Sequence, residues 1–325
     1  MEILITGGAG YIGSHVAHLL IDKGYKVTVI DSLITGNKKL IPKKANFIRC
    51  DIGNKKKINL IFTKKKFSVV FHFAGLIRVD ESIKFPKKYI FNNYHKSKIL
   101  IQACVKNKIK NIIFSSTAGV YGNTKKKNIK ENHKLNPLNP YAKSKILIEN
   151  YIIKEFKKNK LKYIILRYFN VGGADKEKRT GLVSKNSTNL IKVLSEVVFK
   201  KNKKIIINGK NYKTLDGTPI RDFIHISDLA DIHVRSMKYL IKSKKNGIFN
   251  CGYGKGYSVL DVVKTANKLL NNKVKYEFGP RRSGDIEYSV SNPSKFMKLF
   301  KWKPKYNNIN TILKSAIEWE MKSKL

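Results

Sequence analysis

Short apolar segments alternate with longer amphipathic segments through the first half of the chain. Six of these segments are almost wholly apolar and precede residue 168: 3–6, 27–30, 47–49, 69–72, 112–115 and 163–167. Such segments are typical of strands buried on both faces of a parallel sheet, with helices as the crossovers. The pattern therefore predicts an α/β fold with a doubly wound parallel sheet.

The alternation loosens after about residue 175, where Asn- and Gly-containing loops separate less regular elements. We therefore expect two domains, a first over residues 1–175 and a smaller α/β domain over residues 176–325. Some segments of the second half are expected to return to the first domain. Trp302 and Trp319 are expected to anchor the core of the second domain.

The strong basicity of the chain raises nucleic acid or an anionic membrane as a partner. The sequence has 67 basic and 22 acidic residues, and its formal net charge is +45. Only eight of the basic residues are Arg, however, and the Lys residues are scattered in short runs over the whole length. Proteins that read bases and phosphates rely on Arg for bidentate geometry. We expect salt-sensitive, sequence-blind binding at most, and no specific nucleic acid partner.

Cysteine usage and the N-terminus bear on the compartment. Cys50, Cys104 and Cys251 are odd in number and have no metal-type spacing, so neither a disulfide framework nor a metal site is expected. The chain opens MEILI and has neither the cationic start nor the long apolar core of a signal peptide. No apolar run approaches the roughly 20 residues of a membrane span. These features predict a cytoplasmic protein without a membrane partner.

A glycine-rich turn follows the first expected strand. The sequence TGGAGYIGS spans residues 6–14 and runs into a segment with helical spacing of its apolar positions. Glycines let the backbone approach a pyrophosphate, which rests on the positive N-terminus of the helix. Asp31 ends the second strand, 18 residues after Gly13, where a carboxylate accepts bonds from an adenosine ribose and repels a 2′-phosphate. This unit predicts a Rossmann-type domain that binds NAD, and a glycine turn without a ligand is the alternative.

A Tyr followed by a Lys four residues later puts a phenol and an ammonium on one helix face, so the Lys can lower the pKa of the Tyr. The abundance of Lys produces such pairs by chance, and the sequence holds three: Tyr94/Lys98, Tyr121/Lys125 and Tyr141/Lys145. Only Tyr141 follows a Pro at the start of an amphipathic segment, 24 residues after Thr117 at the end of a strand. We therefore assign Thr117, Tyr141 and Lys145 to catalysis, at the carboxyl edge of the sheet.

Six motifs together are typical of one protein family. They are TGGAGYIGS at 6–14, HFAG at 72–75, FSSTAGVYG at 114–122, YAKSK at 141–145, LRYFN at 166–170 and DGTPIRD at 216–222. Over essentially its whole length the chain resembles the extended short-chain dehydrogenase/reductase family, and within it the enzymes that interconvert UDP-galactose and UDP-glucose. The resemblance implies NAD as cofactor and a UDP-sugar substrate. It also implies a homodimer in which helices near 92–106 and 143–158 form a four-helix bundle.

The resemblance assigns residues to both ligands. For NAD it implies contacts at Gly7, Gly10, Tyr11, Ile12, Gly13, Asp31, Asp51, Ile52, Phe73, Ala74, Gly75, Asn92, Lys145 and Phe169. For the UDP-sugar it implies contacts at Thr117, Tyr141, Asn170, Asn189, Leu190, Arg221, Arg282, Asp285 and Ser289. Guanidinium groups suit a diphosphate better than Lys does, although each of the two Arg could instead form a surface ion pair.

Chemistry narrows the reaction within the family. Members that eliminate water typically carry an Asp-Glu pair directly after the active-site Thr, and this chain has Ala118 and Gly119 there. Without that acid and base, return of the hydride is the remaining option. We expect Tyr141, as phenolate, to remove the C4 hydroxyl proton while hydride passes to the nicotinamide, with Thr117 holding the hydroxyl. The 4-keto sugar then turns over and takes the hydride on its other face.

Two departures from the family's pattern bear on specificity. Ile77, followed by Arg78, stands where a Lys is frequent, so this cationic contact is absent or comes from Arg78. Ser289 stands where some members carry Tyr, and a small residue there is associated with room for a 2-acetamido group. We therefore hypothesise that UDP-N-acetylglucosamine is accepted as well.

Three other functions stay open at this point. The nearest is another NAD-dependent nucleotide-sugar epimerase, reductase or decarboxylase, which would release NADH or change the mass of the sugar. A catalytically idle nucleotide-binding scaffold would tolerate the loss of Thr117, Tyr141 or Lys145. A basic nucleic-acid binder would lose affinity steeply with salt.

Overall fold

The computed structural model of the chain describes residues 1–124, 128–184, 187–199, 204–243, 245–271, 274–282 and 284–323. Lys125 of the Tyr121/Lys125 pair lies outside these residues. The chain divides into two compact units. Unit 1 comprises Met1–Val120, Pro137–Arg167 and Ala230–Phe249, and unit 2 comprises Tyr121–Asn136, Tyr168–Leu229 and Asn250–Leu325. Segments from both sides of residue 175 thus contribute to each unit. The expectation that the first domain binds NAD and the second binds the UDP-sugar stays a prediction.

The central sheet has seven strands, and the chain winds away from its middle in both directions. In spatial order the strands are β10 (Gly247–Cys251), β6 (Lys162–Tyr168), β5 (Asn111–Thr117), β4 (Val69–His72), β1 (Glu2–Thr6), β2 (Lys26–Asp31) and β3 (Asn46–Arg49). The pairs from β3 through β5 are parallel. Each of the six apolar segments lies in one of these strands, so the predicted doubly wound α/β fold is confirmed.

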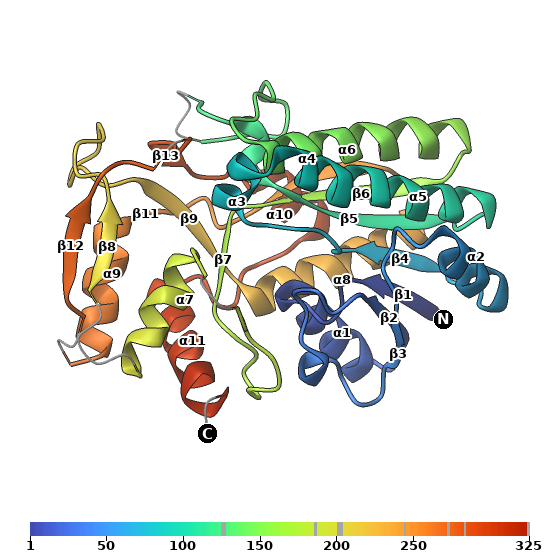
Figure 1. Cartoon of the computed structure of the whole chain (residues 1–325), viewed down its shortest axis with the longest axis horizontal. Helices are drawn as coiled ribbons and strands as arrows, with labels where there is room; N and C mark the ends of the chain where they lie inside the picture. The colour runs from blue at the N-terminus through green and yellow to red at the C-terminus, as the bar shows by residue number, and fades with distance from the viewer. Residues whose placement is uncertain are drawn as a thin grey trace. The chain divides into compact units, whose positions relative to one another are not determined.

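Helices cover both faces of this sheet, which explains why its strands are apolar on both sides. On one face the apolar sides of three helices form a core with the strands: α2 (Lys55–Lys64), α5 (Lys96–Lys106) and α6 (Pro140–Lys158). On the other face lie α1 (Tyr11–Asp22) and α8 (Ile226–Ser243), as Figure 1 shows. There the His233 ring of α8 lies 6.2 Å from that of Phe71 in β4.

Shorter helical segments connect these elements. Two one-turn 3₁₀ helices follow β2 and β5: η1 (Lys38–Leu40) and η3 (Ala118–Tyr121). Three segments lead from β4 into α5: α3 (Val79–Lys84), α4 (Pro86–Tyr89) and the π-helix η2 (Ile90–His95).

Unit 2 contains two small sheets packed with helices. In the first sheet, β9 (Ile220–His225) pairs with three strands: β7 (Asn170–Gly172), β11 (Gly256–Ser258) and β13 (Tyr288–Ser289). The second sheet pairs β8 (Ile205–Asn208) with β12 (Tyr276–Gly279). The helical segments of the unit are α7 (Leu190–Ser195), η4 (Glu196–Val198), α9 (Val259–Leu269), α10 (Ser294–Phe300) and α11 (Ile309–Ser323). The apolar faces of α7, α9 and α11 form its core, and Trp302 and Trp319 are buried as predicted.

The other sequence expectations concern metals, disulfides and membranes. Cys50, Cys104 and Cys251 are free, buried thiols. In the part of the chain that the structure describes, no cluster of His, Cys, Asp and Glu is arranged to hold a metal ion. Among those same residues, no helix combines the length and apolarity needed to cross a bilayer.

Candidate active site

The carboxyl ends of the parallel strands bring several predicted site residues of unit 1 to one edge of the sheet. Thr6 at the end of β1 is in register with Ile30 of β2 and with His72 of β4. His72 is in turn in register with Phe114 of β5. The glycine loop, Asp31, the segment after β4 and Thr117 therefore lie along the same edge. In open α/β sheets the ligand crevice lies at this edge, where the strand order changes direction.

The loop between β1 and α1 is packed so closely that it requires glycine. Gly7 has a φ of +73°, and a Cβ built on it would lie 2.6 Å from the backbone nitrogen of Ala74. A Cβ on Gly13 would lie 2.3 Å from the carbonyl oxygen of Gly7. Helix α1 begins after Gly10 with no side-chain cap, and the N-terminus of a helix is a position that favours an anion. This cradle fits the pyrophosphate of a dinucleotide such as NAD, beside Tyr11 and Ile12 in the first turn.

Asp31 fastens the glycine loop in addition to presenting a carboxylate. Its Oδ2 accepts the N–H of Ala9 at 3.0 Å, and its Oδ1 accepts the N–H of Leu33 at 2.8 Å. Burial raises the pKa of Asp31, and these two backbone hydrogen bonds lower it. Each carboxylate oxygen has a further lone pair, so Asp31 retains the acceptor capacity that a ribose diol requires.

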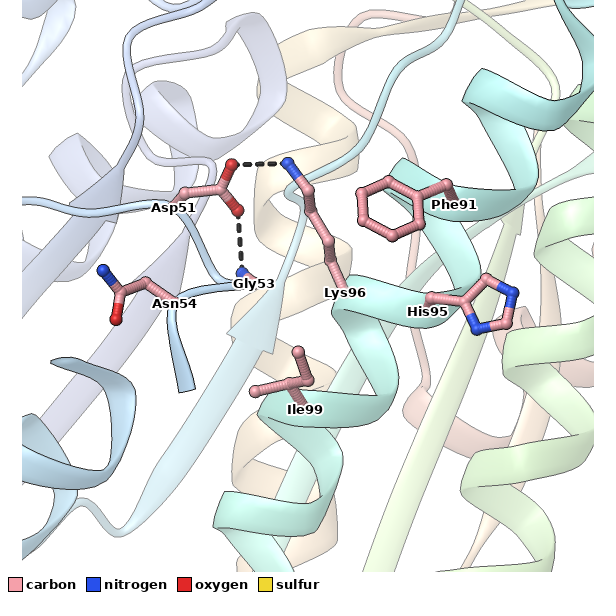
Figure 2. A pocket seen from close by; sticks show the side chains of 7 residues that line it. All are labelled: Asp51, Gly53, Asn54, Phe91, His95, Lys96 and Ile99. Atoms are coloured by element: carbon pink, nitrogen blue, oxygen red, sulfur yellow. Dashed lines mark hydrogen bonds and ion pairs between the residues drawn. The ribbon is translucent and has the colours of Figure 1, made fainter. Parts of the chain in front are cut away.

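A cavity of about 320 Å³ lies beside Asp51. Figure 2 shows its lining: Asp51, Gly53, Asn54, Phe91, His95, Lys96 and Ile99. The Asp51 carboxylate accepts the N–H of Gly53 at 2.7 Å and forms an ion pair with Lys96 at 2.5 Å. Lys96 therefore neutralises a carboxylate that the resemblance assigns to NAD, while Ile52, the next predicted contact, is buried. The role of Lys96 was not predictable from the sequence, because a single Lys in this Lys-rich chain carries no signal.

The loop after β4 is held by Asn93, a residue that no sequence motif singled out. Asn93 accepts the N–H of Leu76 at 2.7 Å and donates to the Leu76 carbonyl at 2.9 Å. A Cβ on Gly75 would lie 3.2 Å from Oδ1 of Asn93 and 3.9 Å from Nζ of Lys145. Asn92, the residue that the resemblance assigns to NAD, donates to Oδ1 of Asn93 at 3.2 Å. Asn93 therefore fixes two predicted cofactor contacts, Gly75 in the loop after β4 and Asn92 in η2.

The three predicted catalytic side chains come together at the start of α6 and the end of β5. The side chain of Asn139 caps α6, which puts Tyr141 in its first turn. The Thr117 side chain acts on the Tyr141 phenol as a hydrogen-bond partner that lowers its pKa. One turn later, Nζ of Lys145 donates to the carbonyl of Ser115 at 2.8 Å and lies 5.9 Å from the ring centroid of Tyr141. This arrangement joins a hydroxyl, a phenol and an ammonium at one point of the sheet edge.

Burial has the largest effect on the protonation of these groups. It raises the pKa of Tyr141 to about 12, although the hydrogen bond with Thr117 lowers it. It also lowers the pKa of Lys145 to about 8, against the charge of Glu149, which raises it. The effect of burial therefore outweighs the lowering of the Tyr141 pKa that was expected from Lys145. With only the chain's own groups around it, the phenol is protonated at neutral pH.

A buried ion pair lies one turn beyond Lys145 in α6. The Glu149 carboxylate accepts Nη2 of Arg167 at 2.6 Å and Nε at 3.1 Å, and it also accepts the Ser116 hydroxyl. The side chains of Arg167 and Glu149 are 3% and 1% exposed. The sequence pattern places Arg167 at the end of an apolar strand but does not reveal its partner Glu149. The one sequence signal for Glu149 is its position four residues after Lys145, which puts both side chains on the same face of the helix.

Unit 2 gathers four of the predicted substrate residues around β9. Nη2 of Arg221 forms an ion pair with Oδ1 of Asp285 at 2.5 Å. Ser289 in β13 is buried and in register with Arg221. The N–H of Asp285 donates to the carbonyl of Arg282 at 3.1 Å, which closes a turn. A cationic group, its carboxylate partner and a small side chain thus lie at one end of this sheet.

The remaining predicted residues of unit 2 lie around β7 and α7. Asn170 begins β7, directly after the buried Phe169. Asn189 caps α7, whose first residue is Leu190, and its Nδ2 donates to the carbonyl of Val171 in β7 at 3.0 Å. The amide of Asn189 therefore ties the helix start to the strand.

Comparisons with known proteins agree with this arrangement of motifs. The sequence model of the NAD dependent epimerase/dehydratase family matches residues 3–252. The chain belongs to this family. The resemblance drawn from the six motifs is thereby confirmed.

Several characterised members of the epimerase/dehydratase family are similar over nearly their full length. The UDP-glucose 4-epimerase of Azospirillum brasilense is 39% identical, over 98% of this chain and 92% of that protein. The UDP-glucose 4-epimerase of Bifidobacterium longum, solved with NAD⁺ and UDP, is 32% identical with a TM-score of 0.94, covering 100% of this chain and 99% of that one. The UDP-Glc/GlcNAc 4-epimerase of Campylobacter jejuni is 38% identical with a TM-score of 0.86, covering 99% of each chain.

The departure at Ile77 and Arg78 puts an exposed Ile and an ion-paired Arg where the family frequently has a Lys. The Ile77 side chain is 65% exposed. The Arg78 guanidinium forms an ion pair with Asp80 at 2.6 Å. A contact from Arg78 to a cofactor would therefore have to compete with Asp80.

Proposed function

We propose that this chain is an NAD-dependent UDP-glucose 4-epimerase, which interconverts UDP-galactose and UDP-glucose. The observation that carries the proposal is the meeting of Thr117, Tyr141 and Lys145 at the sheet edge that also bears the glycine cradle. The relative from Azospirillum brasilense bears that name, and the Bifidobacterium longum structure contains NAD⁺ and UDP. Both relatives support the same substrate class for this chain.

The chain's own groups have distinct roles in this reaction. Tyr141 removes the proton of the C4 hydroxyl, and Thr117 holds the oxygen of that hydroxyl. Lys145, fixed by the carbonyl of Ser115, supplies positive charge that favours the phenolate. The glycine cradle would hold NAD, which would supply a positively charged acceptor for the hydride of the sugar's C4 and a store from which that hydride can return, so that no external reductant is consumed. Ala118 and Gly119 offer no acid or base for elimination, so the sugar keeps its mass.

Substrate recognition is assigned to unit 2. Arg221 and Arg282 would bind the diphosphate, because planar guanidinium groups match phosphate oxygens. Ser289, in register with Arg221, would leave room for a 2-acetamido group. The name of the Campylobacter jejuni relative, which includes GlcNAc, supports this breadth. We therefore include UDP-N-acetylglucosamine among the substrates.

A homodimer through α5 and α6 is part of this proposal. Figure 1 shows these helices side by side on one face of the sheet. Tyr94 in η2, the segment that leads into α5, and Tyr151 in α6 are partly exposed, and their ring centroids are 6.3 Å apart. Sedimentation equilibrium of the purified protein tests this part, and a monomer at micromolar concentration would contradict it.

The reaction is tested by following UDP-galactose with a catalytic amount of NAD. Conversion without net formation of NADH separates an epimerase from a dehydrogenase. An unchanged mass of the sugar separates it from a decarboxylase or dehydratase.

A further inference from the structure

Tyr212, in the loop between β8 and β9, has a buried hydroxyl that no role described above uses. The residue is 7% exposed. Its Oη has no hydrogen-bond partner within the described residues of the chain. A buried hydroxyl without a partner costs free energy in the folded state, so such groups are rare and call for an explanation.

The ring of Tyr212 is held firmly in place. The guanidinium of Arg281 lies 4.0 Å from its ring centroid, and Nε of Arg281 donates to Oδ1 of Asn211 at 2.7 Å. On Gly209, where φ is +86°, a Cβ would lie 2.6 Å from Cε2 of Tyr212. The N–H of Tyr212 donates to the carbonyl of Gly217 at 3.0 Å. Because backbone and ring are both fixed, the hydroxyl cannot turn away to find another partner.

The surroundings of this hydroxyl are those of an anion site. The charged groups that act on the phenol are Asp285, which has the largest effect and is itself paired with Arg221, and the guanidinium groups of Arg281, Arg221 and Arg282. Three of these four groups are Arg, out of eight Arg in the sequence, and the fourth is a carboxylate. Burial raises the pKa of Tyr212, so the hydroxyl keeps its proton and acts as a donor. A fixed O–H donor beside an excess of guanidinium groups suits the oxygens of a diphosphate.

We propose that the Tyr212 hydroxyl donates a hydrogen bond to the diphosphate of the bound nucleotide sugar, beside Arg221 and Arg282. The inference rests on the proposed function and adds to it a residue that the motifs do not contain. The unpaired hydroxyl is a cost in the free protein that substrate binding removes. Tyr212 is therefore a substrate-binding residue and takes no part in the hydride or proton transfer.

The test compares Tyr212→Phe with wild type by calorimetric titration of UDP. The variant keeps the ring on which Arg281 lies and loses only the hydroxyl. We expect its affinity for UDP to fall about tenfold or more, since a hydrogen bond to a charged oxygen is lost. The KM for UDP-galactose should rise with kcat little changed. The melting temperature of the unliganded variant should equal or exceed that of wild type, because an unpaired polar group has been removed.

A matched control is Tyr276→Phe in β12, whose ring is 38% exposed, and which should leave UDP affinity unchanged. If Tyr212→Phe binds UDP within twofold of wild type, the inference is overturned while the epimerase remains. If the wild-type protein itself binds no UDP, the proposed function fails and the inference fails with it.

Discussion

Glu149 and Arg167 form a buried ion pair at 2.6 Å, one helical turn beyond Lys145. The pair joins α6 to β6, and the Ser116 hydroxyl joins the same carboxylate to β5. It thereby fixes the helix that carries both Tyr141 and Lys145 against the sheet. The charge of Glu149 also raises the pKa of Lys145 against the effect of burial. One carboxylate thus supports both the position and the charge of the proposed catalytic groups.

Replacing Glu149 with Gln should therefore affect stability and pH dependence together. Removing one partner of a buried pair leaves Arg167 charged, and we expect a loss of about 3 kcal/mol in the free energy of unfolding. Lys145, whose pKa of about 8 is already below the usual 10.5, would lose its proton at still lower pH. Since the ammonium favours the phenolate, activity falls as pH rises through that pKa. The alkaline limb of kcat/KM should move to lower pH.

The control for this change is Glu155→Gln, further along the same helix. It should leave the alkaline limb where it is in wild type. An unshifted alkaline limb in a folded Glu149→Gln protein would show that the carboxylate does not act on Lys145.

Tyr141→Phe should fold and bind NAD normally but lose most of its turnover. Without the phenol no group accepts the C4 hydroxyl proton, and general base catalysis contributes about a hundredfold or more. Steady-state kinetics with UDP-galactose measures the loss. Tyr94→Phe, in the other helical Tyr/Lys pair, is the matched control. Near-normal turnover of Tyr141→Phe would remove Tyr141 from the mechanism.

Gly13→Ala should weaken NAD binding at least tenfold. The added Cβ would lie 2.3 Å from the carbonyl of Gly7, so the loop must shift away from its cradle geometry. Gly24→Ala is the control, because a Cβ there meets nothing within 4 Å although its φ of +79° is strained. Titration of NAD into each variant measures the effect. Equal affinities would contradict the assignment of this loop to the pyrophosphate.

Ser289→Tyr should reduce activity on the N-acetylated UDP-sugar but not on UDP-galactose. Ser289 is 7% exposed, and a bulky ring in its place would fill the space assigned to the 2-acetamido group. Turnover of UDP-N-acetylglucosamine should fall at least tenfold while UDP-galactose is still converted. Wild-type protein that is inactive on the acetylated sugar would reject the hypothesis outright.

The sheet of unit 1 was predictable because its strands are buried on both faces and are therefore continuously apolar. The short strands of unit 2 gave no such signal. β7 and β11 have three residues each and β13 has two, too few for any periodicity. Their positions depend on pairing with β9, which lies far from each of them in the sequence.

The candidate site shows the same division. Thr117 and Tyr141 were predictable because a strand end and a helix start confer position, and Asp31 because it ends the second strand. The two ion pairs were not predictable, because their partners lie far apart in the sequence. Glu149 and Arg167 are 18 positions apart, and Asp51 and Lys96 are 45 positions apart. Sequence spacing also reveals the Lys that neighbours Tyr141 but not the burial that raises the pKa of its phenol.

The central claim is that the chain epimerises a UDP-hexose without net redox change. The most direct measurement incubates the purified protein with UDP-galactose and catalytic NAD, following the sugar by proton NMR and NADH by its absorbance. The account predicts conversion to UDP-glucose with no accumulation of NADH. An unchanged sugar, or NADH formed in proportion to the sugar consumed, would contradict it.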